Sequence, residues 1–112
     1  MAVFTGCTNL QSVRLEEGAT VIGEYMFLEC TSLSNVELPS TLTTIGNGAF
    51  KQCALETVCL PASVDSIGEY AFQNCTALKS VELPAGLKAL SRYVFNGCTS
   101  LGSIVLPDVL ET

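Results

Sequence analysis

The chain has 112 residues, of which 48% are hydrophobic and 14% are charged, and its formal net charge is −6. This length and composition fit one domain with a continuous apolar core, and the negative charge argues against a nucleic-acid partner because a phosphate backbone would be repelled. The sequence has no run of the roughly 18 apolar residues that a membrane-spanning helix needs, so we expect no membrane insertion in this segment.

A period of 22 or 23 residues runs through the chain. Phenylalanine recurs at intervals of 23, 23, 22 and 23 residues, and a cysteine follows each phenylalanine three positions later. The phenylalanines are Phe4, Phe27, Phe50, Phe72 and Phe95, and the cysteines are Cys7, Cys30, Cys53, Cys75 and Cys98. The sequence therefore contains about five copies of one unit, which reads LxxVxLPxxLxxIGxxAFxxCxx.

Each copy contains a short predicted strand, in which two apolar residues flank one variable residue. This alternation is typical of a strand with one face buried, and proline then stops the pairing because it has no N–H to donate. The apolar pairs are Val13/Leu15, Val36/Leu38, Val58/Leu60, Val81/Leu83 and Ile104/Leu106, and the prolines are Pro39, Pro61, Pro84 and Pro107, with Glu16 in that place in the first copy. Equivalent strands are predicted to run parallel and to stack about 4.8 Å apart.

The segment IGxxAFxxC follows the strand in each copy and is predicted to form a single helical or 3₁₀ turn on the far side of the coil. Its apolar residues are spaced by four, one and three positions, which suits one turn that packs inward. The dipeptides Asn47-Gly48 and Asn96-Gly97 are typical of local turns. One residue is missing at Cys53-Ala54-Leu55 relative to Cys30-Thr31-Ser32-Leu33, and we expect a loop to accommodate the deletion.

These elements predict a mostly β member of the α/β class, a short right-handed solenoid of about five coils with a parallel strand face and short helical or 3₁₀ turns. We expect residues 1–112 to form one repeat domain. The sequence starts inside one copy and stops inside another, as a piece of a longer array would. Open coils at Val3 to Leu15 and Ile104 to Leu110 would expose apolar edges that could pair with another copy of the chain.

The repeat resembles the leucine-rich repeats of the BspA-like, or Treponema pallidum, type. The resemblance covers nearly the whole chain and is carried by the combination seen in Leu60-Pro61, Ile67-Gly68, Ala71-Phe72 and Cys75. The chain departs from the commonest leucine-rich consensus, since the position that usually holds a buried asparagine is occupied by Gly18, Thr41, Ser63, Gly86 and Val109. The resemblance implies a surface protein of bacteria or protists, including adhesins, and therefore a cell-surface or secreted location.

Six cysteines in a short chain would ordinarily suggest three disulfides, but the repeat argues against them. Five occupy one column, whose side chains should point the same way from neighbouring coils, whereas a disulfide needs Cβ vectors that face each other. We interpret the five as small buried residues. The sixth, Cys59, lies between Val58 and Leu60 at an outward strand position and is predicted to be exposed.

Neither catalysis nor metal binding is favoured by the sequence, and no cofactor is indicated. The chain has no histidine, its eleven acidic residues are scattered over variable positions, and it has no CxxC pair that would suggest zinc. Three tyrosines, Tyr25, Tyr70 and Tyr93, share one register with Gly48 between the first two; packing along the turns is favoured over a binding stripe.

The outward residues of the strand face are the candidate binding surface, because the core does not constrain them and they vary from copy to copy. One column contains Arg14, Glu37, Cys59, Glu82 and Val105, and a second contains Ser12, Asn35, Thr57, Ser80 and Ser103. Small polar groups leave room for a partner, and the charged column would discriminate between partners. The alternative interpretation is that these residues only keep the sheet soluble.

We therefore expect a non-catalytic module that recognises a protein or glycan through the outward strand face, and the resemblance implies a role in adhesion. The alternative is a structural spacer or a self-associating segment of a larger surface protein.

Overall fold

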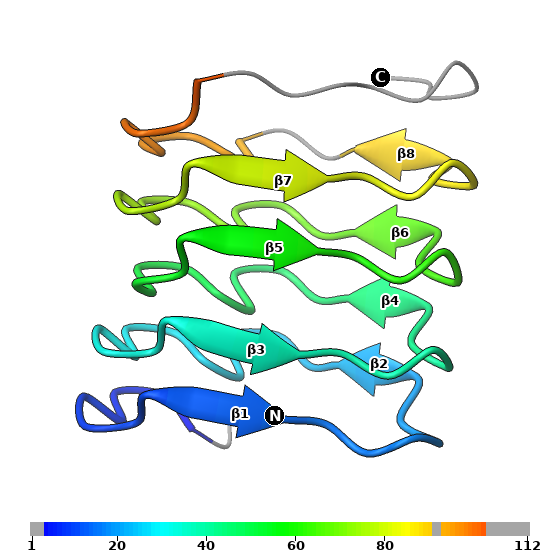
Figure 1. Ribbon diagram of the computed structural model, residues 1–112, viewed down its shortest axis with the longest axis horizontal. Coiled ribbons are helices and arrows are strands. Elements are labelled where there is room, and N and C mark those ends of the chain that lie inside the picture. The colour runs from blue at the N-terminus through cyan, green and yellow to red at the C-terminus, as the bar shows by residue number, and fades with distance from the viewer. Residues whose placement is uncertain (1–3, 91–92, 103–112) are drawn as a thin grey trace.

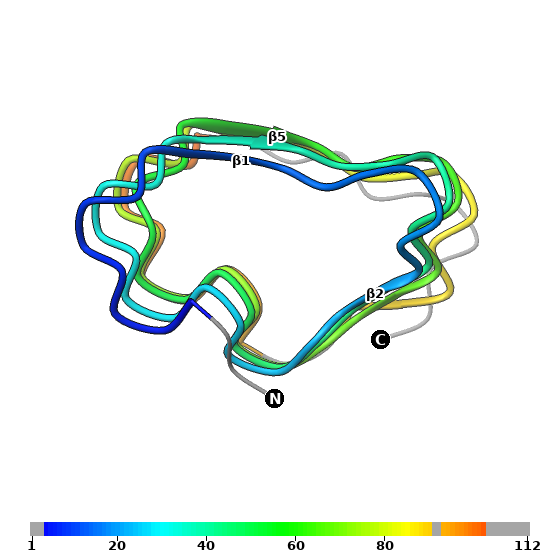
Figure 2. The ribbon, with the colours of Figure 1, turned by 90° about the horizontal axis from the view of Figure 1, so that it is seen from below.

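The Val-x-Leu strands lie one above the other along a solenoid, as their fixed period requires. The computed structural model describes residues 4–90 and 93–102 (Figure 1). Within these residues, four three-residue strands form the front of the solenoid, and they are β1 (Ser12–Arg14), β3 (Asn35–Glu37), β5 (Thr57–Cys59) and β7 (Ser80–Glu82). Four two-residue strands form the back, and they are β2 (Val21–Ile22), β4 (Thr44–Ile45), β6 (Ser66–Ile67) and β8 (Ala89–Leu90). Seen along the stack, the coils follow nearly the same path (Figure 2).

Residues one period apart are neighbours in space, which confirms the central prediction from the sequence. On the front, β1 pairs with β3 in parallel, with Ser12 beside Asn35 and Arg14 beside Glu37, and β5 pairs with β7 in the same way. Each of β3, β5 and β7 ends one residue before the leucine that precedes proline. The solenoid fold that the sequence predicted is confirmed.

The front ladder is interrupted between β3 and β5, which the sequence did not lead us to expect. Within the described residues the front strands form two separate pairs, β1 with β3 and β5 with β7. The interruption follows the one-residue deletion, where the Ala54 amide donates to the carbonyl of Leu33 at 2.9 Å just before β5 begins. A loop therefore does not fully accommodate the missing residue, and Figure 1 shows the wider spacing between β3 and β5.

The back ladder is continuous. It runs in the order β2-β4-β6-β8, all parallel, with Ile22 beside Ile45 and Ile45 beside Ile67. The three isoleucines point inward and are buried, while the preceding residue in each strand faces outward or is half-buried. The coils thus remain joined on the back at the level where the front ladder stops.

The far-side segment IGxxAFxxC is a succession of tight turns, and the predicted helical or 3₁₀ turn is wrong for the described residues. In the second coil, the amides of Met26, Leu28 and Cys30 donate to carbonyls three residues earlier in the same coil. The amides between them donate instead to the next coil, as from Phe27 to Ala49 at 2.8 Å. Tyr25 has a φ of 55° and Glu29 a φ of 60°, and these left-handed residues prevent a helical run.

The core is a single apolar column without buried charged or polar residues among those described. Its centre is a stack of phenylalanine rings, whose consecutive centroids lie 5.3, 5.3, 5.5 and 5.8 Å apart from Phe4 to Phe95. Interplanar angles of 8° or less keep the rings parallel, because each coil repeats the backbone of the previous one. Phe27, Phe50 and Phe72 are almost completely buried.

The glycine of the IG motif is required where neighbouring coils approach each other closely. A Cβ at Gly46 would lie 2.8 Å from the backbone nitrogen of Glu24, and a Cβ at Gly68 would lie 2.5 Å from that of Asn47. No real side chain fits at such distances without a shift of the backbone. The glycine of this motif therefore allows neighbouring coils to approach to the observed distance.

Candidate functional site

The outward side chains of the front strands are exposed, as the alternation predicted. Arg14, Glu37, Cys59 and Glu82 are all exposed, while Val58 and Val81, which alternate with them, retain 6% and 7% of their accessible surface. The second column is exposed as well, and its described members are Ser12, Asn35, Thr57 and Ser80. The last predicted members of the two columns, Ser103 and Val105, lie outside the described residues.

The structure brings these residues together in two groups. Register places Arg14 beside Glu37 and Cys59 beside Glu82, and likewise Asn35 beside Ser12 and Thr57 beside Ser80. The interruption of the front ladder separates the two groups, so that Asn35 and Glu37 lie on one side of it and Thr57 and Cys59 on the other. Within the candidate surface, the facing edges of β3 and β5 are therefore not paired with each other in the described part of the chain.

The candidate side chains make no side-chain hydrogen bond or ion pair in the described part of the structure, whereas several polar side chains elsewhere on the solenoid are hydrogen-bonded. Thr41 donates to the carbonyl of Ala19 at 2.7 Å, Thr43 to that of Thr20 at 3.1 Å, and Ser100 to that of Thr76 at 2.7 Å. These contacts tie one coil to the next. The polar side chains of the front strands make no such contact between coils in the described part of the structure.

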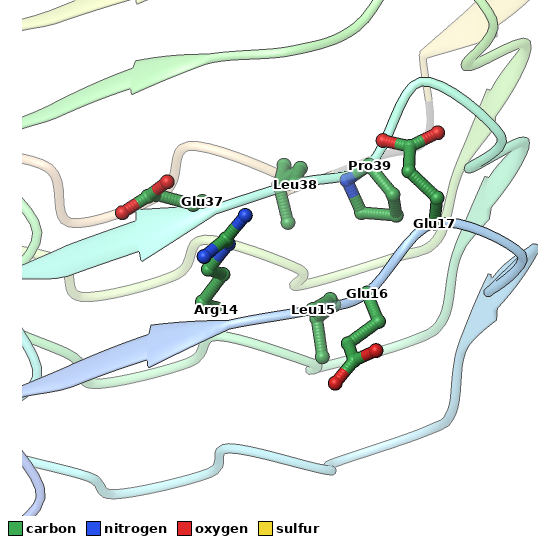
Figure 3. Close-up of a pocket in the computed structure, with 7 residues that line it drawn as sticks. All are labelled: Arg14, Leu15, Glu16, Glu17, Glu37, Leu38 and Pro39. Atoms are coloured by element: carbon green, nitrogen blue, oxygen red, sulfur yellow. The ribbon is translucent and has the colours of Figure 1, made fainter.

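A pocket of about 520 Å³ opens at the carboxyl ends of β1 and β3. It is lined by Arg14, Leu15, Glu16, Glu17, Glu37, Leu38 and Pro39 (Figure 3). The Ser40 hydroxyl and amide donate to the Glu17 carboxylate at 2.7 and 3.0 Å and lower the pKa of Glu17 below its ordinary value. Sequence reasoning identified Arg14 and Glu37 but missed the other carboxylates; the signal was Glu16, which stands where later copies have proline.

Four of the five cysteines in the column are buried and have hydrogen-bonded thiols, whereas Cys7 in the first coil is half-buried, so the predicted burial is wrong for Cys7. Cys30, Cys53, Cys75 and Cys98 each donate from Sγ to the carbonyl of a phenylalanine in the preceding coil, at 3.0 to 3.2 Å. Burial raises the pKa of Cys75 to about 12 and also raises the pKa values of the other three. The sequence predicted the burial of this column but not the hydrogen bonds, whose signal was the strict three-residue spacing from phenylalanine.

The tyrosine column packs along the turns, as the sequence favoured. Tyr70 and Tyr93 stack with centroids 5.3 Å apart, and the Lys51 ammonium lies 5.6 Å from the centre of the Tyr70 ring. The Tyr25 ring lies over Gly48, where a Cβ would come within 2.4 Å of it. The tyrosines therefore support the turns and lie away from the front strands.

Among the described residues, no three histidine, cysteine or acidic side chains form a group that could hold a metal ion. The described segments also include no helix with the length and apolarity that crossing a bilayer requires.

Residues 1–112 match a family model described as BspA type Leucine rich repeat region (6 copies). The chain belongs to this family. The resemblance deduced from the spacing of phenylalanine, cysteine, glycine and proline is confirmed. BspA-type repeats thus account for the regular coil and for the pairing of equivalent positions.

Three solved structures of leucine-rich repeat proteins are similar to this BspA-type chain. A protein from Bacteroides ovatus is 30% identical with a TM-score of 0.75, and the match covers 96% of this chain and 34% of that one. The T. pallidum leucine rich repeat protein is 34% identical with a TM-score of 0.68, covering 94% and 61% respectively. A leucine rich cell surface protein from Faecalibacterium prausnitzii is 27% identical with a TM-score of 0.74, covering 90% and 36%.

The chain spans less than two thirds of the length of each of these three proteins. No curated protein sequence matches it.

Proposed function

We propose that the front face is a non-catalytic recognition surface for a protein ligand. The observation that carries this proposal is that the polar side chains of the front are exposed, make no side-chain hydrogen bond in the described structure, and are aligned in two columns by the parallel register. A polar side chain that is exposed and unpaired keeps its full hydrogen-bonding capacity for a partner. The family supports the coarser description, a repeat module of surface or interaction proteins.

The chemistry of the front face favours a protein over a glycan. Its outward columns carry a guanidinium, two carboxylates and small hydroxyl and amide groups, but no aromatic ring among the described positions. Aromatic faces are the platforms on which sugar rings usually stack, and here the rings lie in the core or along the turns. The mixed charges, together with the unpaired strand backbone beside Glu37 and Cys59, suit a polypeptide with its own charges and amides.

A cell-surface or secreted setting and a role in adhesion belong to the same proposal. The support is the family and the similar cell surface protein from F. prausnitzii.

The test is a pull-down from extracellular-matrix proteins, run beside a glycan array. We expect the triple variant Glu37→Arg, Thr57→Arg, Glu82→Arg to lose at least about tenfold in affinity for any captured protein, because each change places a long cation where a short or negative group contacts the ligand. Glu69→Arg is the matched control, since Glu69 is also exposed but lies on the turn side. Retained binding by the triple variant, or binding on the glycan array alone, would refute the proposal.

A second candidate function, self-association, is favoured by one observation on the first described coil. Phe4 is 38% exposed and Val21 is 57% exposed, although both belong to columns that are buried or half-buried in later coils. The strands β1 and β2 each have one edge without a partner in the described structure. Such edges can pair with a second copy of the chain.

We expect static light scattering to show a mass that rises with protein concentration. Val21→Lys should reduce that rise, because a charge on the open edge opposes pairing. Ala62→Lys adds the same charge at an exposed position in a middle coil and should leave the rise unchanged. A constant monomer mass would exclude self-association without affecting the front-face proposal.

A further inference from the structure

Three corners of the solenoid have the same backbone construction. In each of them the chain leaves a front strand, passes a proline and turns toward the back, over residues 39–43, 61–65 and 84–88. The amide of the third residue after the proline closes each turn with a bond of 3.1 Å to the proline carbonyl, and these bonds run from Leu42 to Pro39, from Val64 to Pro61 and from Leu87 to Pro84. The amide of the fourth residue joins each corner to the preceding coil, from Thr43 to Thr20 at 2.9 Å, from Asp65 to Thr43 at 3.0 Å and from Lys88 to Asp65 at 3.2 Å. The three corners therefore have equivalent backbone hydrogen bonds.

The first two corners also contain a side-chain hydroxyl that reaches the preceding coil. It belongs to the second residue after the proline, the position that holds asparagine in the commonest leucine-rich consensus. The Thr41 hydroxyl donates to the carbonyl of Ala19 at 2.7 Å and accepts from the Gly18 amide at 2.9 Å. The Ser63 hydroxyl donates to the carbonyl of Leu42, which is the residue equivalent to Ala19. Each of these corners is thus tied to the preceding coil by the backbone and by a hydroxyl.

The corner 84–88 lacks this hydroxyl because Gly86 occupies the position. The Val64 carbonyl, which is equivalent to those of Ala19 and Leu42, receives no hydrogen bond within the described residues. Both coils that meet at this corner are described there, so their contact is complete. The difference between the corners lies in one side chain.

The position of Gly86 has the space and the backbone conformation that threonine needs. A Cβ there would have the Ala62 carbonyl oxygen, at 4.0 Å, as its nearest atom outside the adjacent residues. The backbone of Gly86 is not left-handed. A hydroxyl-bearing residue at position 86 is therefore expected to reach the Val64 carbonyl, as Ser63 reaches that of Leu42.

We propose that the corner 84–88 is a weak joint of the solenoid, which opens locally more often than the corners 39–43 and 61–65. Burial does not distinguish the corners, since their apolar residues are all fully buried, and these are Leu42, Val64 and Leu87. Opening at the earlier corners must break a hydroxyl bond as well as the backbone bonds, and each further bond lowers the population of the open form. The weak joint follows β7 directly, so this freedom lies at the end of the candidate surface that contains Glu82.

The test is native-state hydrogen exchange, followed by NMR, at the amides of Thr43, Asp65 and Lys88. These amides make the equivalent bonds to the preceding coil, and the protection of each is its exchange rate in the unfolded chain divided by its rate in the folded chain. We expect the protection of Lys88 to be lower than that of Thr43 and of Asp65 by about fivefold, because one hydrogen bond fewer opposes opening. Equal protection at the three amides would overturn the proposal.

Two variants at position 86 isolate the effect of the hydroxyl. Gly86→Thr supplies the missing donor, and Gly86→Val has nearly the same shape without a donor. We expect the protection of Lys88 to be about fivefold higher in the threonine variant than in the valine variant. If the two variants protect Lys88 equally, the missing hydroxyl is not the cause and the proposal is wrong.

The reverse changes remove the hydroxyl from the earlier corners. We expect Thr41→Val to lower the protection of Thr43, and Ser63→Ala to lower that of Asp65, each by about fivefold and toward the value at Lys88. The protection of Lys88 should stay unchanged in the Thr41→Val variant. An equal fall at Lys88 in that variant would indicate a general loss of stability and would contradict a joint set by single hydroxyls.

Discussion

At the scale of single residues, the cysteine column joins packing and hydrogen bonding in one small side chain. Each buried thiol fills space beside the phenylalanine stack and caps a phenylalanine carbonyl of the preceding coil, as Cys75 does for Phe50 at 3.1 Å. That carbonyl would otherwise lose part of its hydrogen bonding in an apolar interior. Cysteine thus serves here as a polar link that remains apolar enough for the core.

Cys75→Ala should lower the free energy of unfolding by about 1–3 kcal/mol, through a small cavity and the loss of the thiol hydrogen bond. Urea denaturation measures the change. Cys59→Ala is the control, since Cys59 is exposed and lies outside the column, and its effect should stay within about 0.5 kcal/mol. Equal effects of the two changes would contradict the role given to the buried thiols.

At the scale of elements, the separation between coils is set by glycine. Gly46 lies against the backbone of Glu24 and Gly23, so one added methyl group would have to push two coils apart. A strand ladder tolerates little separation, because its hydrogen bonds weaken steeply with distance.

We expect Gly46→Ala to cost about 1–3 kcal/mol of stability, the range for a side chain forced into a full space. Thermal and urea unfolding would both report it. Gly86→Ala offers the matched comparison, because the nearest atom to a Cβ there is the Ala62 carbonyl oxygen at 4.0 Å, and Gly86 is not left-handed. It should be neutral or slightly stabilising, and a large loss at Gly86 would argue against close approach as the cause at Gly46.

The front strands could be predicted from the sequence, but the back strands and the far-side turns could not. The Val-x-Leu alternation was sufficient to predict the front strands and the exposed positions of Glu37, Cys59 and Glu82. Two-residue back strands such as Thr44–Ile45 are too short to show any alternation. The far-side spacing fits a helical turn equally well, and the outcome depends on hydrogen bonds to the next coil, which spacing alone does not reveal. The same limit hid the pocket at Glu16 and Glu17 and the broken front ladder.

At the scale of the whole molecule, the buried thiols make stability depend on pH. Their folded pKa values are raised by burial, that of Cys75 to about 12, while an unfolded chain releases thiol protons near the ordinary pKa of about 8.5. At a pH between these two pKa values only the unfolded state releases the thiol protons, and this release lowers the free energy of the unfolded state. The stability from these groups is therefore fully present below the unfolded pKa and is lost as the pH rises above it.

We expect the melting temperature to fall steadily above about pH 8.5, with up to about 1.4 kcal/mol lost per pH unit for each buried thiol. Cys53→Ala should make the decline shallower, since one of the titrating groups is gone, even though this variant starts from a lower stability. Cys59→Ala should keep the slope of the parent chain. A melting temperature that does not change up to about pH 10 would show that the thiols are not protected in the folded state.

The unequal joining of the coils gives the molecule a preferred direction of bending. Between β3 and β5 the back strands remain hydrogen-bonded while the front strands do not. A force that spreads the front at this level breaks no ladder bonds there, whereas the opposite bend would have to stretch the ladder from β4 to β6. The solenoid should therefore bend about the β4–β6 ladder at the back. Its two halves can then tilt relative to each other and follow a curved surface that lies against the front.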